Sequence, residues 1–424
     1  MKSQLDTSPL GIRTSRVMDG NKVRFVIQDS ESLQTLIALS MYEAYLSKKH
    51  DSHNTIHNIL KKLFYLIAWG NKSGIDIDSI LLTGEMIEPK QVNAFGAWLT
   101  QRGKLHADGT ISPIAINGIL DVVSQAFRWF ADQYVSFSGS ASEREIHIKM
   151  YKDSIKERFS EQCEKVRKKN SADDLTDEEI SKIEQFLKPE NRLKNNLKLS
   201  KAQALRDYLI WRLVIEFGLR EGEILALRLE DCPHQNQNYI KIVRIEERGG
   251  GNYTDPRGAY APRPKTLSRE LGFILKDSPI PRLINDYITK YRRRKVIKHG
   301  RAVVEHIVDF PAFLILSHQH DKGVPLSIAS LQGVAAAIRI GSGVEKFHWH
   351  LGRHAFFNRA YASIIDFKEK DSELHNDRLR DLVYWGGWES EQSLQLYINR
   401  ARRHRAQTTL CFYQSEKNEW NALK

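Results

Sequence analysis

Apolar residues at helical spacing are the feature that most constrains how this chain folds. Ile116, Leu120, Val123, Phe127 and Phe130 follow one another at steps of four, three, four and three. This spacing places their side chains on one face of a helix. The segments around residues 53–69 and 205–213 repeat the pattern. We therefore predict a mainly helical protein.

Polar segments divide the chain, whose 424 residues are too many for one ordinary core. Small polar residues follow residue 135 and indicate a linker. Thr176 and Glu179 then have the spacing of a capping box, which opens a new helix. The predicted parts are an N-terminal extension at 1–30, a helical domain at 31–135, a linker at 136–170, a second domain at 171–400 and a tail at 401–424.

A small antiparallel β element is predicted within the second domain. Apolar and polar residues alternate from Tyr239 to Glu246, and a second strand follows near residues 271–274. The loop between them is long for a hairpin, which favours contact with a ligand. From about residue 280 to the end the pattern is helical again. The predicted fold class is therefore mainly α with a small antiparallel β element.

The charge balance indicates a polyanionic partner. Lys and Arg outnumber Asp and Glu by 64 to 52, a formal net charge of +12, and a basic surface that neutralises phosphates releases condensed counterions. No apolar run approaches the roughly 20 residues that a membrane span needs, and the first residues lack a signal peptide. Cys163, Cys232 and Cys411 are far apart and have no metal-like spacing. These features favour a cytoplasmic protein.

Four separated segments contain the residues that phosphoryl transfer to a side chain requires. They are Phe217–Leu227 with Arg220, Arg263–Arg269 with Lys265, His350–His354 with Arg353, and Gly386–Tyr397 with Trp388. In-line attack on a phosphodiester builds negative charge on the non-bridging oxygens, and cations aimed at them lower the barrier. The planar donor fork of arginine matches two phosphate oxygens. We predict that Arg220 and Arg353 form this clamp.

These ordered segments resemble the motif boxes of the tyrosine recombinases, the family of phage lambda integrase, Cre and the Xer proteins. Residues 217–227 are similar to the box GLR-x-x-E-(I/L)-x-x-L, and residues 350–353 to the box H-x-x-R. In this family a His or Trp precedes the nucleophilic Tyr by nine positions, and here 397 − 388 = 9, with Trp388 before Tyr397. The resemblance covers about residues 175–400, and the upstream domain resembles the core-binding domain in position and character.

The resemblance implies a site-specific recombinase, or integrase, that cleaves and rejoins DNA through a 3′-phosphotyrosine in the integration or excision of a mobile element. Its partners would be double-stranded DNA recombination sites, a homo-tetramer on paired sites, and candidate accessory DNA-bending proteins. No cofactor or metal is expected, because the covalent intermediate conserves the energy of the phosphodiester bond. The implied location is the bacterial cytoplasm, in association with the nucleoid.

The resemblance also implies roles for single residues. Tyr397 is the expected nucleophile, and because a free tyrosine has a pKa near 10 it needs cations or a base to ionise. Lys265 is the expected general acid for the leaving 5′ oxygen. Arg263, Arg269 and Lys276 compete with Lys265 for this role.

Other residues are expected to assist. His350 helps proton movement, and the indole N–H of Trp388 can donate to a phosphate oxygen. Glu223 and His354 are expected to support these side chains from behind. The basic residues expected on the DNA-binding surface are Lys48, Lys49, Lys61, Lys62, Arg102, Lys104 and Arg128 in the helical domain, and Arg263 and Arg269 in the second domain.

Two positions depart from the family pattern. Gly352 stands where the family usually has Leu, and since glycine in a helix costs about 1 kcal/mol we expect looser packing near Arg353. Trp388 stands where most members have His. Neither change removes a charge that the mechanism needs.

Other interpretations are less consistent with the complete set of boxes. A non-enzymatic DNA-binding protein would use the basic surface alone, including residues 292–298, and a type IB topoisomerase would use similar chemistry to relax supercoils. His350 and His354 lie one helical turn apart, but zinc hydrolases of that pattern need Glu where this chain has Leu351. The tail carries large apolar side chains between residues 410 and 423, so it is expected to dock on its own subunit or on a neighbouring one.

Overall fold

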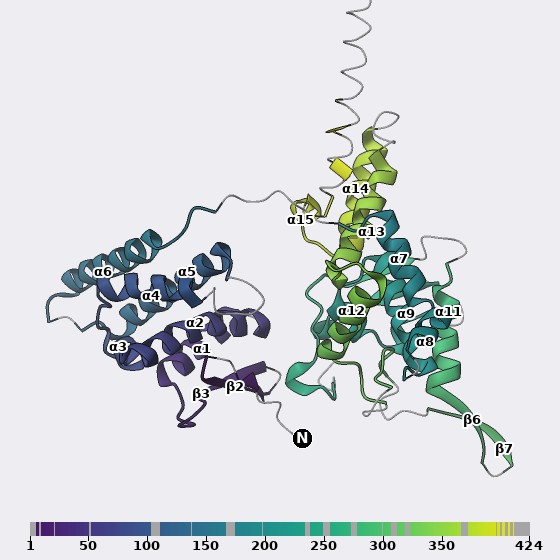
Figure 1. The fold of residues 1–424 in the computed structure, drawn as a ribbon, viewed down its shortest axis with the longest axis horizontal. Helices are drawn as coiled ribbons and strands as arrows, with labels where there is room; N and C mark the ends of the chain where they lie inside the picture. The colour runs from purple at the N-terminus through teal and green to yellow at the C-terminus, as the bar shows by residue number, and fades with distance from the viewer. Residues whose placement is uncertain are drawn as a thin grey trace, which may run out of the picture. The chain divides into compact units, whose positions relative to one another are not determined.

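The chain divides into two compact units, Met1–Lys169 and Asn170–Lys424, which are described in turn (Figure 1). The computed structural model describes residues 6–7, 10–20, 22–50, 52–102, 111–136, 138–166, 174–196, 198–233, 238–248, 255–272, 278–298, 300–306, 312–318, 323–365, 372–395, 397–398, 401–402, 406–407 and 410. Helices dominate both units and the sheets are small and antiparallel, as predicted. No helix among these residues is long and apolar enough to cross a membrane.

Unit 1 combines a three-stranded sheet with six helices in its described part. Its elements are β1 Asp6–Thr7, β2 Ile12–Asp19, β3 Lys22–Asp29, α1 Ile37–Lys49, α2 His53–Ser73, α3 Ile77–Thr83, α4 Pro89–Arg102, α5 Pro113–Tyr134 and α6 Ala141–Glu161. The strands are antiparallel in the order β1-β2-β3, and β2 pairs with β3 from Ile12↔Asp29 to Asp19↔Lys22. The apolar face predicted for residues 116–130 is the buried face of α5.

One segment of unit 1 differs from the sequence-based expectation, and another agrees with it in part. Most of the expected linker forms α6, which packs along α5 and buries Tyr151, Ile155 and Phe159. Its apolar residues are sparse among charges, so the segment has a polar sequence although one side is covered. The N-terminal extension has a β-like sequence at residues 22–27, which lies in β3, whereas β1 and β2 were not expected. The sheet is tied to α1 because Arg24 donates to the buried Glu43, Nη2 to Oε2 at 2.8 Å.

Unit 2 is built around α9 and contains the candidate catalytic segments. Its helices are α7 Asp177–Leu187, α8 Pro189–Asn195, α9 Lys201–Phe217, α10 Glu221–Ala226, α11 Ile280–Tyr287, α12 Ile328–Ser342, α13 Trp349–Ile365, α14 Ser372–Gly386 and α15 Glu391–Gln395. Its strands are β4 Tyr239–Ile242, paired with β5 Arg269–Gly272, and β6 Arg293–Lys298, paired with β7 Arg301–His306. Short 3-10 turns occupy Leu229–Asp231, Ile245–Glu247 and Gly258–Tyr260.

Local sequence signals explain several boundaries in unit 2. The capping box that opens α7 is present, because Glu179 N donates to Thr176 Oγ1 at 3.2 Å and Thr176 N to Glu179 Oε2 at 2.8 Å. The helix α9 ends at Gly218, whose φ of +61° suits glycine. The expectation of continuous helix after residue 280 is wrong at β6 and β7, where basic and β-branched residues pair as a hairpin.

Gly352 tightens the packing near Arg353, contrary to the expectation. It lies on α13, which packs along α9, and a Cβ atom at residue 352 would lie 2.5 Å from Cγ1 of Val214. The missing side chain therefore lets the two helices approach. Sequence reasoning counted the local cost of glycine in a helix and could not see Val214, which is distant in the chain.

We predict that Gly352→Ala lowers the free energy of unfolding. Overpacking costs about 1–3 kcal/mol, which exceeds the gain of about 1 kcal/mol in helix propensity. Gly333→Ala on α12 is the matched control, because nothing lies within 4 Å of the Cβ it would add, and it should stabilise by about 0.5–1 kcal/mol. Urea unfolding of both variants measures the difference. A Gly352→Ala protein as stable as Gly333→Ala would contradict the packing argument.

Candidate active site

A buried carboxylate joins two of the predicted segments. Glu223 lies on α10 and is 1% exposed. Its Oε2 accepts a hydrogen bond from the backbone N–H of Arg220 at 2.8 Å. The guanidinium of Arg269 donates to both of its oxygens, at 3.0 Å and 3.1 Å, and the Thr266 hydroxyl donates to Oε1. Glu223 thus fixes the start of α10 against the loop that precedes β5.

This carboxylate stays ionised in its buried position. Burial alone would raise the pKa of Glu223, but the charges of Arg269, Arg353 and Arg220 outweigh burial and lower it to about 2. Arg269 is itself buried, and its Nε donates to the Trp385 carbonyl at 2.7 Å. The expected DNA contact of Arg269 does not fit this burial, because its donors are occupied inside the protein. A basic loop residue has the same sequence signal whether it is solvated or buried.

Glycine turns hold the two predicted clamp arginines together. The carbonyl of Gly386 accepts from Nη1 of Arg220 at 3.2 Å and from Nη2 of Arg353 at 2.9 Å. Arg353 also donates through Nη1 to the carbonyl of Gly218. At Gly387 φ is +62°, and a Cβ there would lie 2.7 Å from Thr266 Cβ. The turn at 386–387 therefore places the segment that leads to Trp388 against the residues that surround Glu223.

Arg353 lies beneath an aromatic cluster. Its side chain is fully buried, and its guanidinium carbon is 4.7 Å, 5.0 Å and 5.2 Å from the ring centres of Phe357, Trp388 and Tyr397. Burial and the charge of Arg220 lower the pKa of Arg353 to about 10, so it remains a cation at neutral pH. Its Nε has no hydrogen-bond partner among the described residues.

Tyr397 contacts two neutral histidines. Its hydroxyl lies 3.4 Å from Nε2 of His350, and its ring centre is 4.5 Å from that of His354. Packing around each imidazole lowers the pKa of both histidines to about 4, and the charge of Arg353 adds to this. At neutral pH both rings are uncharged, so a ring nitrogen of His350 can accept a hydrogen bond from the Tyr397 hydroxyl.

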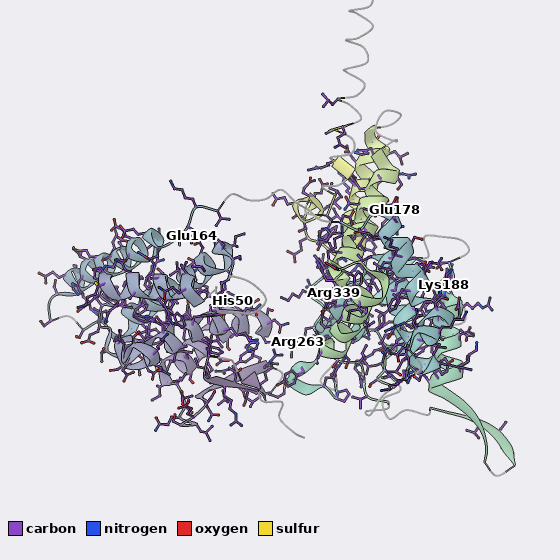
Figure 2. All side chains as sticks on the ribbon, in the orientation of Figure 1. His50, Glu164, Glu178, Lys188, Arg263 and Arg339 are labelled. Atoms are coloured by element: carbon purple, nitrogen blue, oxygen red, sulfur yellow. The ribbon has the colours of Figure 1, made fainter. Side chains whose placement is uncertain are left out.

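Lys265 is exposed in a loop with a fixed backbone. The guanidinium of Arg244 donates through Nε to the Thr266 carbonyl at 2.8 Å, and Leu267 N donates to the Gly387 carbonyl at 3.1 Å. Lys265 is thus one residue from Thr266, which contacts Glu223. Of its predicted competitors, Arg263, which is labelled in Figure 2, is half-buried. Arg269 is buried, and Lys276 lies outside the described residues.

Sequence reasoning missed three groups that complete the site. The Thr266 hydroxyl and the Gly386 carbonyl are described above, and the third is Asn358. Its side chain donates to the His354 carbonyl at 3.1 Å and accepts from Ala401 N at 3.2 Å. Asn358 therefore ties α13 to the segment that follows Tyr397. Motif spacing gave no signal for it, because an amide that follows two phenylalanines looks like any polar helix position.

The other predicted basic residues lie on unit 1. Lys48, Lys49 and Lys61 are exposed, whereas Lys62 and Arg128 are half-buried. The side chain of Arg102 and all of Lys104 lie outside the described residues, as does most of the tail at 401–424. Among the described residues no group of three metal-ligating side chains could hold a metal ion.

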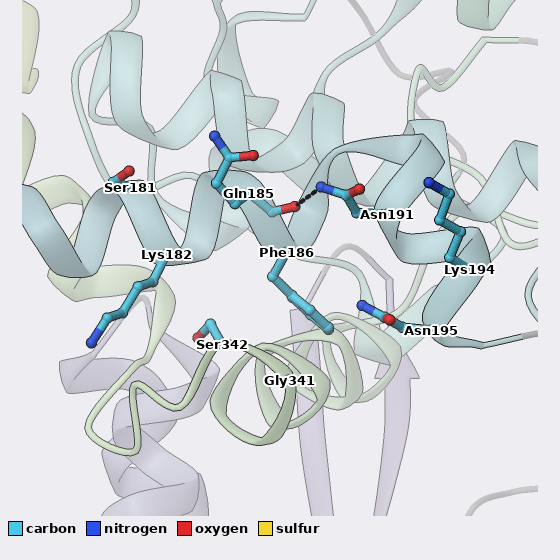
Figure 3. A pocket seen from close by; sticks show the side chains of 9 residues that line it. All are labelled: Ser181, Lys182, Gln185, Phe186, Asn191, Lys194, Asn195, Gly341 and Ser342. Atoms are coloured by element: carbon cyan, nitrogen blue, oxygen red, sulfur yellow. Dashed lines mark hydrogen bonds between the residues drawn. The ribbon is translucent and has the colours of Figure 1, made fainter.

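One hollow among the described residues is separate from the candidate catalytic residues. A pocket of about 400 Å³ lies between α7, α8 and α12 (Figure 3). Its lining is Ser181, Lys182, Gln185, Phe186, Asn191, Lys194, Asn195, Gly341 and Ser342. None of the candidate catalytic residues belongs to it, so chemistry at Tyr397 does not depend on this pocket.

Known proteins give a limited comparison. No protein-family model matches the chain, and no curated protein matches its sequence. A crystal structure of XerH site-specific recombinase bound to palindromic difH substrate, in a post-cleavage complex, is 15% identical, with 85% of this chain and 80% of that chain covered and a TM-score of 0.49. Its pre-cleavage complex with difH is 14% identical, with 87% and 83% covered and a TM-score of 0.47. The function proposed below rests on the site residues instead.

We predict that Glu223 makes stability depend on pH. Its pKa is lower in the folded chain, about 2 against an ordinary 4.5, so its stabilising effect is complete above about pH 5 and is lost as pH falls toward 2. The advantage in unfolding free energy of the native chain over Glu223→Gln should shrink by about 2 kcal/mol between pH 6 and pH 3. Urea unfolding over this pH range measures it.

The matched control is Glu221→Gln, the same exchange on the same helix. Burial raises the pKa of Glu221, so acid should not lower the unfolding free energy of the native chain relative to this variant. For Glu223→Gln, a difference in unfolding free energy that stays constant from pH 6 to pH 3 would contradict the ionised, buried carboxylate.

Proposed function

We propose that this chain is a tyrosine-type site-specific DNA recombinase that cleaves one strand with Tyr397 and rejoins it through a 3′-phosphotyrosine. The observation that carries this proposal is that the side chains of Tyr397, His350, Arg353 and Arg220 lie close together. The hydroxyl of Tyr397 lies beside His350, and its ring lies over Arg353. Arg353 in turn shares the Gly386 carbonyl with Arg220. A nucleophile, a proton acceptor and two cations are thus brought together from three distant segments.

The chemistry follows from these positions. The Tyr397 oxygen attacks phosphorus, its proton passes to Nε2 of His350, and the bond from phosphorus to the 5′ oxygen breaks. Lys265 gives a proton to that leaving oxygen. Arg220 and Arg353 stabilise the charge that develops on the non-bridging oxygens, and Trp388 adds an indole N–H donor. Attack by a 5′ hydroxyl on the phosphotyrosine reverses the step, so no nucleotide is consumed.

DNA has to rearrange this site before cleavage. Arg353 is fully buried and Tyr397 is 6% exposed, so a phosphate reaches the guanidinium after the rings over it move. The Nε–H of Arg353, which has no partner among the described residues, is a donor for that phosphate. A buried donor without an acceptor costs about 1–3 kcal/mol, and binding of a phosphate oxygen removes this cost.

The wider assignment rests on the resemblance of the sequence boxes. It comprises recombination sites in duplex DNA as the substrate, a homo-tetramer on paired sites, accessory DNA-bending proteins, and integration or excision of a mobile element in a bacterial cytoplasm, at the nucleoid. Unit 1 would act as the core-binding domain through its exposed lysines. The tail after residue 401 would dock on its own or a neighbouring subunit.

We predict that Tyr397→Phe abolishes covalent attachment to DNA and leaves DNA affinity within about twofold, because it removes the nucleophile and no cation. The substrates are nicked duplexes tiled across the DNA that flanks the coding sequence. A nick just beyond the cleaved phosphate lets the short fragment with the 5′ hydroxyl diffuse away, which traps the adduct. A denaturing gel measures the attached fraction. Tyr361→Phe removes a hydroxyl from the same buried cluster and should retain the adduct. An adduct that persists with Tyr397→Phe would refute the assignment.

A further inference from the structure

The β6–β7 ribbon is a second basic feature of unit 2 that the proposed chemistry does not use. β6 follows directly on the π-helical turn Ile288–Arg292, which extends α11. In Figure 1 the two strands of the ribbon project beyond the helices of unit 2. At the turn between them Gly300 has a φ of +75°, a conformation that suits glycine.

Positive charge lies at both ends of this ribbon. Arg293, Arg294 and Lys295 begin β6 at its base, and Lys298 pairs with Arg301 beside the turn. Glu305 is the acidic residue of the two strands. These five basic residues against one acidic residue give the ribbon a net charge of +4 with histidine neutral, one third of the +12 of the whole chain.

The middle of the ribbon is apolar. Val296 pairs with Val303 and Ile297 with Ala302, and Val303 is 38% exposed. A two-stranded ribbon is marginally stable by itself in water, because neither face is covered by a third layer. This composition favours a partner that covers the apolar middle and neutralises both charged ends.

Duplex DNA fits these dimensions. Strands rise about 3.3 Å per residue, so the four steps from Arg294 to Lys298 span roughly 13 Å. The major groove of DNA is about 12 Å wide and admits a two-stranded β-ribbon. A ribbon that enters the groove across its width therefore has basic positions at its base and its tip that are as far apart as the phosphates on the two sides of the groove, with the apolar pairs between them.

We propose that the β6–β7 ribbon lies in the major groove and is a second DNA contact, separate from the site of cleavage. This inference rests on the proposed function, because it makes the same duplex the ligand. The contact adds length and affinity to the bound site. It assigns a role to the basic residues at positions 293–298, which the cleavage chemistry leaves unexplained.

The test is the salt dependence of DNA binding by the full chain. Affinity for a fluorescent 40-base-pair duplex of random sequence is measured by anisotropy over a series of NaCl concentrations. The double variant Lys298→Gln/Arg301→Gln removes the two charges at the tip. Each lost phosphate contact reduces the slope of log affinity against log salt by about 0.9, so we expect a slope lower by about 1.8.

The matched control is Lys198→Gln/Lys201→Gln, which removes two charges from exposed positions near the start of α9 and should leave the slope nearly unchanged. Equal slopes for both double variants would overturn the proposal. A changed oligomeric state without DNA, with an unchanged slope, would show that the ribbon instead binds a second copy.

An outcome that refutes the ribbon contact can be distinguished from one that refutes the proposed function. The tip variant should still form the Tyr397 adduct at saturating DNA. A native chain that binds DNA with the expected slopes but forms no adduct would refute the recombinase and leave the ribbon contact standing.

Discussion

The ion pair between Glu223 and Arg269 is the interaction on which the rest of the candidate site depends. Both side chains are buried, and removing one partner from such a pair typically costs about 3–5 kcal/mol because the other charge is stranded. Glu223 also accepts hydrogen bonds from the backbone N–H of Arg220 and from the Thr266 hydroxyl. Its oxygens act as acceptors alone, which an amide at this position could not do. One carboxylate therefore fixes where α10 begins and where the Lys265 loop lies.

The pair also determines the position of the candidate catalytic side chains. Arg269 donates to the Trp385 carbonyl. The next residue in the chain is Gly386, whose carbonyl accepts hydrogen bonds from both Arg220 and Arg353. Trp388 follows this turn directly, and α15 leads from it toward Tyr397. The cations of the site are thus held by carbonyls and by one carboxylate, so their mutual repulsion is offset within the protein. The neutral histidines beside Tyr397 add no further positive charge.

Sequence patterns predicted the parts of this arrangement that depend on local spacing. The face of α5, the Thr176 capping box and the spacing within each of the four candidate catalytic segments follow from residues close together in the chain. The burial of Arg269, the close contact of Gly352 with Val214 and the Asn358 contact with Ala401 join distant residues, and no local pattern records them. Charge-rich segments gave an ambiguous pattern. The residues of α6 have the polar sequence of a linker, and those of the β6–β7 ribbon lie in a region whose overall pattern is helical.

The central claim is that the converging residues make Tyr397 the covalent nucleophile, and the most direct test is to identify the residue attached to DNA. Tryptic digestion of the trapped adduct should release the peptide of residues 381–400, which contains Tyr384 and Tyr397. Fragmentation by mass spectrometry then locates the nucleotide. The account predicts the nucleotide on Tyr397, with Tyr384 unmodified. A nucleotide on Tyr384 or on any other residue would contradict it, as would the absence of an adduct on every duplex of the flanking DNA.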